Sequence, residues 1–340
     1  MHIPANIWWN LHVTESGFRA KTKPMDASAL DELRLLIARH VRQTPGPLRE
    51  MPHVTLAQET APTPPCVHIV EPVFSIVVQG SKRVGVAGRS LSYGVNQFLV
   101  VSVDMPVDAY VEEASTAAPY LGFGLALKPE VIASLLLEAG AARTINEDRP
   151  GIAVSDLTQD LLDPIVRLVR LLDRPSDVPI LAPAIEREIL WRLINGPQGA
   201  LVRQLGIADS RMAQIGRAVR WLRNQFAEAV RIEQLAAIAG MSVTSFHRHF
   251  RTVTSMTPIQ YQKQLRLQAA RTRLMSGRED VAKVAFAVGY DNPSQFSREY
   301  RRMFGKPPGR DGIELRADPT PAFAASPLPL DYRLIEAAPA

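Results

Sequence analysis

The chain has one cysteine, Cys66, among its 340 residues. A single thiol cannot form an intramolecular disulfide or a cysteine-based zinc site, so a secreted disulfide scaffold and the zinc-finger classes are excluded. No apolar run approaches the roughly 18 residues that a membrane-spanning helix needs. We therefore expect a protein of the reducing cytoplasm that has no membrane partner.

Catalytic and metal-binding patterns are also missing. In the strand-rich region only His53 and His68 occur, 15 residues apart and without a nearby His-x-His pair. His247 and His249 do form such a pair, but residues i and i+2 of a helix point about 200° apart and cannot chelate one ion. No phosphate-binding loop, nucleophile elbow or Ser-His-Asp arrangement stands out. The sequence predicts no enzyme, no metal site and no cofactor.

The charge that is present divides the chain in two. Hydrophobic residues make up 46% and charged residues 21%, as in globular proteins, and the length suits two domains. Residues 211–310 carry 18 Lys and Arg against 6 Asp and Glu, a net +12, whereas the remainder carries 21 against 28, a net −7. Such a basic third is typical of a nucleic-acid-binding module. On charge alone, a solvated helical surface explains it equally well.

The first part of the chain is expected to contain one helix. Residues 1–24 show little pattern and are expected to be disordered, and translation from Met25 is an alternative to Met1. Apolar residues at near-helical spacing predict a helix over residues 26–43. The prolines between positions 45 and 65 exclude regular helix there.

From Val67 onward the pattern becomes that of short strands. Short β-branched runs alternate with glycine-containing turns up to Ala126, which indicates an antiparallel sandwich or barrel, with a hairpin at residues 79–82. Tyr93, Tyr120 and Phe123 lie on these strands, where they line a ligand cavity or pack in the core. Cys66, at the entrance of this region, is either a thiol that an electrophile or oxidant modifies or a small buried hydrophobe.

After Ala126 the periodicity is helical up to about Phe304. Two adjacent amphipathic segments, residues 161–172 and 180–194, lie outside both the strands and the basic region. They pack on a second copy of the chain or cover the sheet. The glycines and proline of residues 196–199 are the best candidate for a linker.

The basic region contains an internal repeat with a spacing of 49–50 residues. Its two copies read IEQLAAIAGMSVTSFHRHFRTVTSMTP and VAKVAFAVGYDNPSQFSREYRRMFGKPP. In each copy a short helix ends at a glycine, Gly240 or Gly289, which accepts a left-handed backbone. Ser242 in the first copy, and Asp291 or Asn292 in the second, can cap the helix that follows. Each copy therefore has the parts of a helix-turn-helix.

The second helix of each copy is expected to have one buried and one exposed face. The aromatic pairs Phe246 with Phe250 and Phe296 with Tyr300 lie four residues apart and must face the core. The opposite faces are left for DNA, where arginine can bind guanine bidentately, or a phosphate, and Ser, Thr and Gln contact bases more weakly. The predicted DNA-binding residues are Val243, Thr244, His247, Arg248 and Arg251 in the first copy and Pro293, Ser294, Gln295, Ser297, Arg298 and Arg302 in the second.

A proline-started helix is expected between the two copies. Residues 258–275 would form a helix about 27 Å long. This length suits two recognition helices placed about one DNA turn apart, or about 34 Å, on one face of a duplex. One chain could then read two successive major-groove segments.

The basic region resembles the AraC/XylS family of bacterial transcription regulators over about residues 211–308. The segments that carry the resemblance are IEQLAAIAGMS, VAFAVGY, YQKQLRLQAARTRLM, with Arg266 where the family usually has arginine, and SQFSREYRRMFG. The family often continues after the second unit with a proline and an aromatic-arginine pair, whereas here Gly309-Arg310-Asp311-Gly312 follows Pro308. The resemblance implies a regulator, usually an activator, that binds promoter DNA and contacts RNA polymerase.

Residues from Glu71 to Leu136 look similar to the cupin-like N-terminal domain of one subgroup of that family. This likeness implies a homodimer and an effector-sensing β-domain, and it does not identify the small molecule. The possible sensor residues are Cys66, Tyr93 and Tyr120. Two alternatives stay open: a repressor or architectural DNA-binding protein without an effector, and a cupin-type enzyme with a helical tail.

These observations predict an α+β protein with an N-terminal cupin-like antiparallel barrel or sandwich, flanking helices and an all-α C-terminal domain with tandem helix-turn-helix units. The expected divisions are an extension at 1–24, a sensor domain at 25–150, a helical dimerisation segment and linker at 151–199, a DNA-binding domain at 200–312 and a tail at 313–340.

Overall fold

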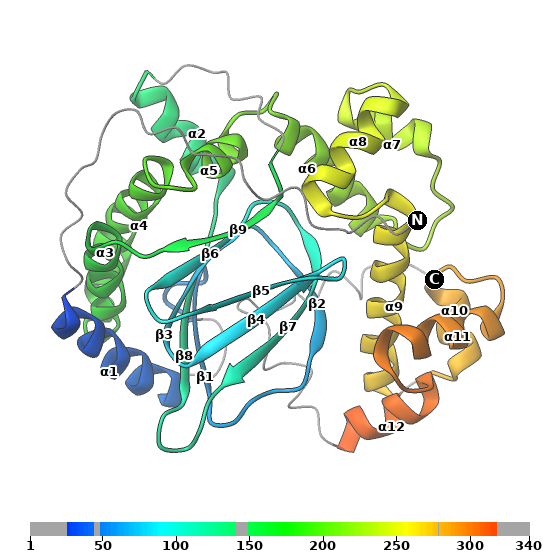
Figure 1. Ribbon diagram of the computed structural model, residues 1–340, viewed down its shortest axis with the longest axis horizontal. Helices are drawn as coiled ribbons and strands as arrows, with labels where there is room; N and C mark the ends of the chain where they lie inside the picture. The colour runs from blue at the N-terminus through cyan, green and yellow to red at the C-terminus, as the bar shows by residue number, and fades with distance from the viewer. Residues whose placement is uncertain (1–25, 44–47, 141–148, 278, 318–340) are drawn as a thin grey trace, which may run out of the picture.

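The computed structural model describes residues 26–43, 48–140, 149–277 and 279–317. The expectations for residues 1–24 and for the start at Met25 lie outside this part of the chain. In Figure 1 two sheets occupy the centre, with α1 (Ala27–Gln43), α3 (Gln159–Arg170) and α4 (Val178–Ile194) on one side and the C-terminal helices on the other. The predicted α+β class is confirmed. No described helix is both long and apolar enough to cross a bilayer.

The sheets form the β-domain, by which we mean residues 48–156 where described. The order of the first sheet is β1 (Val54–Glu59), β8 (Tyr120–Ala126), β3 (Val73–Gln79), β6 (Gln97–Val101) and β9 (Ile152–Asp156). The order of the second is β2 (Cys66–Val70), β7 (Met105–Glu113), β4 (Ser81–Val86) and β5 (Arg89–Gly94). All of these strand pairs are antiparallel. Phe74 packs against Phe98 and Phe123 in the core, with ring centroids 5.5 and 6.5 Å apart.

Two expectations for this region are wrong. Residues 79–82 do not form a hairpin, because β3 ends in the first sheet and β4 begins in the second. Gly80 turns the chain between the sheets with a φ of +79°, and a Cβ atom there would lie 2.3 Å from the carbonyl oxygen of Glu113. The chain after Ala126 is not helical throughout, because β9 pairs with β6 and completes the first sheet.

The helices that flank the β-domain form layers. The predicted N-terminal helix is confirmed as α1, which packs on β1, β3 and β8. Helix α3 packs on α1, and α4 packs on α3 after the short 3-10 turns η1 (Leu171–Asp173) and η2 (Pro175–Asp177). Helix α5 (Gly199–Gly206) follows a tight turn at residues 195–198 and packs against α2 (Pro129–Glu138).

The basic region forms seven helices among the described residues: α6 (Arg211–Asn224), α7 (Ile232–Ala239), α8 (Val243–Thr254), α9 (Pro258–Ser276), α10 (Val281–Ala287), α11 (Pro293–Phe304) and α12 (Pro308–Ala317). The apolar core of the β-domain continues without a break into α6, α7 and α8. A second core lies among α9, α10 and α11, and Phe226 borders both cores.

Candidate nucleic-acid interface

The first helix-turn-helix unit consists of α7, a glycine turn and α8. Gly240 ends α7 with a φ of +69°, and the Ser242 hydroxyl caps α8 by accepting a hydrogen bond from the backbone of Ser245. Phe246 and Phe250 are fully buried, with ring centroids 5.3 Å apart. These contacts fix one face of α8 toward the core, as the repeat predicts.

The other face of α8 points to solvent. The five predicted DNA contacts in this unit are all exposed: Val243, Thr244, His247, Arg248 and Arg251. His249 is buried, with 3% of its surface exposed, so the two histidines of the His-x-His pair lie in different environments. No group of three or more His, Cys, Asp or Glu side chains among the described residues could hold a metal ion.

The second unit, α10, a glycine turn and α11, repeats this arrangement. Gly289 has a φ of +88°. Of the two candidate caps, it is Asn292 whose side chain caps α11, accepting from the backbone of Ser294 at 2.8 Å and of Gln295 at 3.2 Å. Phe296 and Tyr300 are fully buried, so α11 also has a single face in the core.

The outer face of α11 is polar and basic. Ser294, Gln295, Arg298 and Arg302 are exposed, whereas Pro293 and Ser297 are half-buried. Glu299 is the acidic residue of this helix, and it is bound by Lys263 of α9 at 2.9 Å and by the Tyr290 hydroxyl at 2.8 Å. Burial opposes its ionisation, but these partners prevail and lower the pKa of the carboxyl. The negative charge of Glu299 is therefore balanced by Lys263 and does not compete with DNA for the arginines on the outer side of α11.

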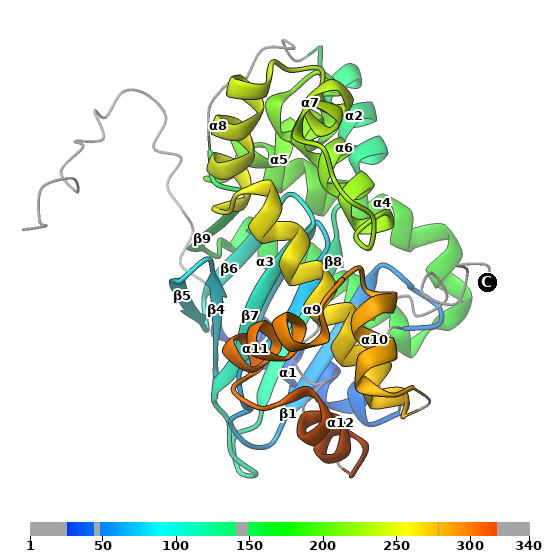
Figure 2. The ribbon, with the colours of Figure 1, turned by 90° about the vertical axis from the view of Figure 1, so that its right-hand side faces the viewer.

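The two recognition helices both lie against the linker helix α9. Figure 2 shows α8 along the vertical direction of the view and α11 across it, so the two helices are not parallel. Helix α9 spans 19 residues, close to the predicted length, and begins with a capping box between Thr257 and Gln260. A rod of this length separates the units by less than one DNA turn along its own axis.

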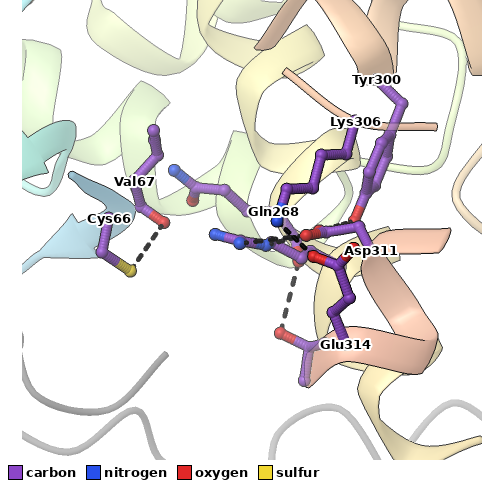
Figure 3. Close-up of polar contacts among 9 residues, drawn as sticks. Cys66, Val67, Gln268, Tyr300, Lys306, Asp311 and Glu314 are labelled. Carbon is purple, nitrogen blue, oxygen red and sulfur yellow. Dashed lines mark hydrogen bonds and ion pairs between the residues drawn. The ribbon is translucent and has the colours of Figure 1, made fainter. Parts of the chain in front are cut away.

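The end of the second unit is held by α12, which sequence reasoning missed. The Asp311 carboxylate is 3% exposed and accepts hydrogen bonds from Arg271 of α9 at 2.9 Å and from the Tyr300 hydroxyl at 2.8 Å (Figure 3). The signal for α12 was Pro308, 50 residues after the Pro258 that begins α9. Helix α12 continues past position 312, where the DNA-binding domain was expected to end and the tail to follow.

The first unit is attached to the β-domain by an ion-pair cluster. Arg223 of α6 binds Asp104 at 2.9 Å and Glu71 at 2.6 Å, and the Tyr261 hydroxyl of α9 donates to the Asp104 backbone carbonyl at 2.8 Å. Burial raises the pKa of the Asp104 carboxyl although Arg223 opposes this shift. Asp104 and Glu71 lie outside the strands, so these contacts join loops of the β-domain to α6 and α9.

A narrow cavity lies between the two sheets of the β-domain. Its polar lining consists of His68, Ser75, Lys82 and Tyr93, and the remaining lining residues are apolar. Burial lowers the pKa of Lys82 to about 8 and that of His68 to about 4. Of the three possible sensor residues, Tyr93 lines this cavity, whereas Tyr120 is buried outside the lining.

Cys66 lies at the start of β2, where this strand faces the linker helix. Figure 3 shows it near Gln268 of α9, beside the cluster of Tyr300 and Asp311. Its side chain is 4% exposed, and burial raises the pKa of its thiol. Both observations disfavour the reactive thiolate form.

The fold and the exposed faces define a class of protein: a regulator with an N-terminal β-domain and a C-terminal pair of helix-turn-helix units. A model of the AraC-type transcriptional regulator N-terminus matches residues 50–201, and a helix-turn-helix domain model matches residues 235–311. The chain belongs to the AraC/XylS family of transcription regulators.

Relatives of known function match part of this chain. The HTH-type transcriptional activator RhaS of Salmonella agona is 30% identical over 186 residues, which are 52% of this chain and 65% of that protein. RhaS of Escherichia fergusonii is 31% identical over 162 residues, 46% of this chain and 57% of that protein. The match therefore spans less than two thirds of either relative.

A solved structure shares the fold of about three quarters of this chain. ToxT from Vibrio cholerae has a TM-score of 0.51 and 8% identity, with 76% of this chain and 97% of that chain covered. This likeness concerns the fold alone. It agrees with the order of a β-domain followed by paired helix-turn-helix units.

Proposed function

We propose that the chain binds promoter DNA through α8 and α11 and activates transcription. The observation that carries the proposal is that both units, in the one strongly basic region, bury an aromatic face and expose a face of hydrogen-bonding and arginine side chains. The eleven residues predicted from the repeat supply the contacts, with arginine reading guanine or holding phosphate. Because α8 and α11 are not parallel, the duplex bends to meet both.

The partners follow from the family and from the surface. An activator of this family contacts RNA polymerase at the promoter in the cytoplasm. A homodimer would use the outer face of α4, where Ile180 is 76% and Trp191 is 38% exposed. These residues lie three helical turns apart on one face of α4, with Ala184 and Arg187 between them, and this face can meet the same face of a second copy.

The cavity of the β-domain is the proposed effector site. Nδ1 of His68 lies 3.2 Å from the Cys66 carbonyl, which can only accept, so Nδ1 carries the proton and Nε2 is an acceptor. This Nε2 is buried and has no hydrogen-bond partner in the described part of the chain. The cavity has room for about one water molecule, so an effector that donates a hydroxyl to His68 would have to widen it.

Modification of Cys66 is the other proposed trigger. Its place against α9 would couple a modified thiol to the linker helix, but its burial opposes the chemistry. Induction of the target promoter in a strain with Cys66→Ser separates the two triggers. An unchanged response removes the thiol as the trigger, and a lost response with unchanged DNA affinity assigns sensing to the thiol.

The function is tested by mapping the chromosomal sites that the protein occupies and measuring transcription of the neighbouring genes with and without it. The proposal expects occupied promoters whose transcription falls when the protein is removed. Occupied promoters whose transcription rises would make it a repressor. An absence of specific sites would contradict DNA binding as the function.

A further inference from the structure

Arg266, in the middle of the linker helix α9, binds both helix-turn-helix units at once. Its guanidinium donates to the backbone carbonyls of Phe226 at 2.8 Å, Ala227 at 3.1 Å and Glu228 at 2.9 Å, in the α6–α7 loop that leads into the first unit. It also donates to the carbonyl of Gly289 at 2.7 Å, in the turn of the second unit. Four carbonyls from two units therefore converge on one side chain.

The two units also touch each other directly at this point. A Cβ atom on Gly289 would lie 2.2 Å from the Ala227 carbonyl oxygen, so the turn of the second unit is in contact with the loop of the first. Phe226, in the same loop, packs against the cores of both units. Gln262, one turn before Arg266, donates to the carbonyls of Phe226 and Glu228 at 2.9 and 2.7 Å. Helix α9 is thus not a free spacer.

We infer that Arg266 is a positioning residue that joins the two units into one body and so fixes the spacing of the two DNA segments that the chain reads. The inference rests on the proposed function. A planar guanidinium suits this role because its five donors form a rigid fork, whereas the lysine ammonium is a single point that cannot reach both groups of carbonyls. All three guanidinium nitrogens of Arg266 donate to backbone carbonyls, so the residue acts on DNA through the relative placement of α8 and α11.

The physical consequence concerns the two-segment site. Two linked modules gain about 10² or more in affinity when both engage, and they lose this gain when the geometry forbids it. A rigid junction makes the gain depend sharply on the distance between the segments. A loosened junction lowers the gain at the correct distance but tolerates other distances.

The test uses the full chain and a parent duplex that the wild-type chain selects from random sequence. A second set of duplexes carries two or five base pairs inserted between the two segments. In a third set, one of the two segments is scrambled, which gives single-segment duplexes. Affinities are measured by fluorescence anisotropy at one salt concentration, because phosphate contacts make affinity salt-dependent. For the wild type, the insertions should weaken binding about 100-fold. For Arg266→Ala, binding to the parent duplex should be about tenfold weaker than for the wild type. The insertions should then weaken the binding of this variant by less than about tenfold relative to its own binding to the parent duplex.

Binding to the single-segment duplexes separates positioning from folding. Arg266→Ala should bind them within about twofold of the wild type, since neither recognition helix is altered. Arg266→Lys should shift spacing tolerance in the same direction if the alanine variant folds poorly. The matched control is Arg273→Ala, an α9 arginine whose ion-pair partner at 3.4 Å, Glu279, lies just before α10. This variant should keep the wild-type dependence on spacing.

A second pair of variants probes the junction while residue 266 stays arginine. Gly289→Ala forces a Cβ against the Ala227 carbonyl and should broaden spacing tolerance as Arg266→Ala does. Gly305→Ala is its control, because Gly305 also has a positive φ, +77°, but nothing within 4 Å of the added atom.

Three results decide the inference. An undiminished 100-fold cost of insertion in Arg266→Ala and Arg266→Lys would overturn it. Equal loss on single-segment and two-segment duplexes would make Arg266 a folding residue and would also overturn it. If the wild-type chain selects no duplex at all, the proposed function itself fails.

Discussion

Replacing Lys82 by methionine should stabilise the folded protein at neutral pH. The Lys82 side chain lies between the sheets with 6% of its surface exposed. Burial lowers its pKa from the ordinary 10.5 to about 8, a shift that the nearby Glu59 opposes. At pH 7 the ammonium is charged in both states, so the folded state carries the full cost of the buried charge. With about 1.4 kcal/mol for each tenfold change in proton affinity, that cost is about 3 kcal/mol.

The sign of the pH dependence follows from proton counting. Between pH 8 and 10.5 the unfolded chain binds more protons at Lys82 than the folded chain does, so the stability of the wild type rises with pH across this window. The advantage of Lys82→Met should therefore shrink from about 3 kcal/mol at pH 7 to about 1 kcal/mol near pH 10. The proposed effector site predicts that the stabilised variant no longer responds to its effector.

Urea denaturation followed by tryptophan fluorescence at pH 7 and pH 10 measures both values. Lys283→Met, at an exposed position on α10, is the matched control and should change stability by less than about 0.5 kcal/mol. A destabilised Lys82→Met at pH 7, or a gain that does not change with pH, would refute the reasoning. Either result would mean that the buried ammonium is compensated by its surroundings.

Two further substitutions test the fold and the assembly. Gly80→Ala should destabilise the β-domain by about 2 kcal/mol or more in thermal unfolding, because strain at positive φ adds to the clash with Glu113. The control is Gly88→Ala, which has a φ of +81° and open space around the added atom, so only the strain should lower its stability. Equal losses of stability in the two variants would contradict the clash. Aspartate at both Ile180 and Trp191 should convert the proposed dimer to a monomer in analytical ultracentrifugation, and an unchanged mass would place the dimer interface elsewhere.

The DNA-binding part could be predicted because its signals are local. A glycine at the turn, a cap and an aromatic pair four residues apart recur in both copies, and each specifies backbone geometry or burial within a few residues. The choice between Asp291 and Asn292 as the cap could not be made from the sequence, since both residues suit the position. In the structure, the Asn292 side chain makes the contact.

The errors lie where structure depends on distant partners. Gly80 looks like a hairpin turn because its neighbours alternate like strands, but which sheet each strand joins is decided by contacts with β7 and β8. Strand β9 has a weak pattern of its own and exists because it extends the edge of the first sheet beside β6. In the same way, the four carbonyls that Arg266 binds come from two segments that no local pattern connects.

The most direct test of the claim that α8 and α11 both dock on DNA is a comparison of binding affinities for one selected duplex at fixed salt. The proteins compared are the wild type, Arg248→Ala, Arg298→Ala and the double variant. Each single variant should lose about 1–3 kcal/mol of binding free energy if its arginine reads a base, and the double variant should lose about the sum. Footprints should show two protected segments, one weakened in each single variant. Unchanged affinity in all three variants would contradict the assigned recognition faces.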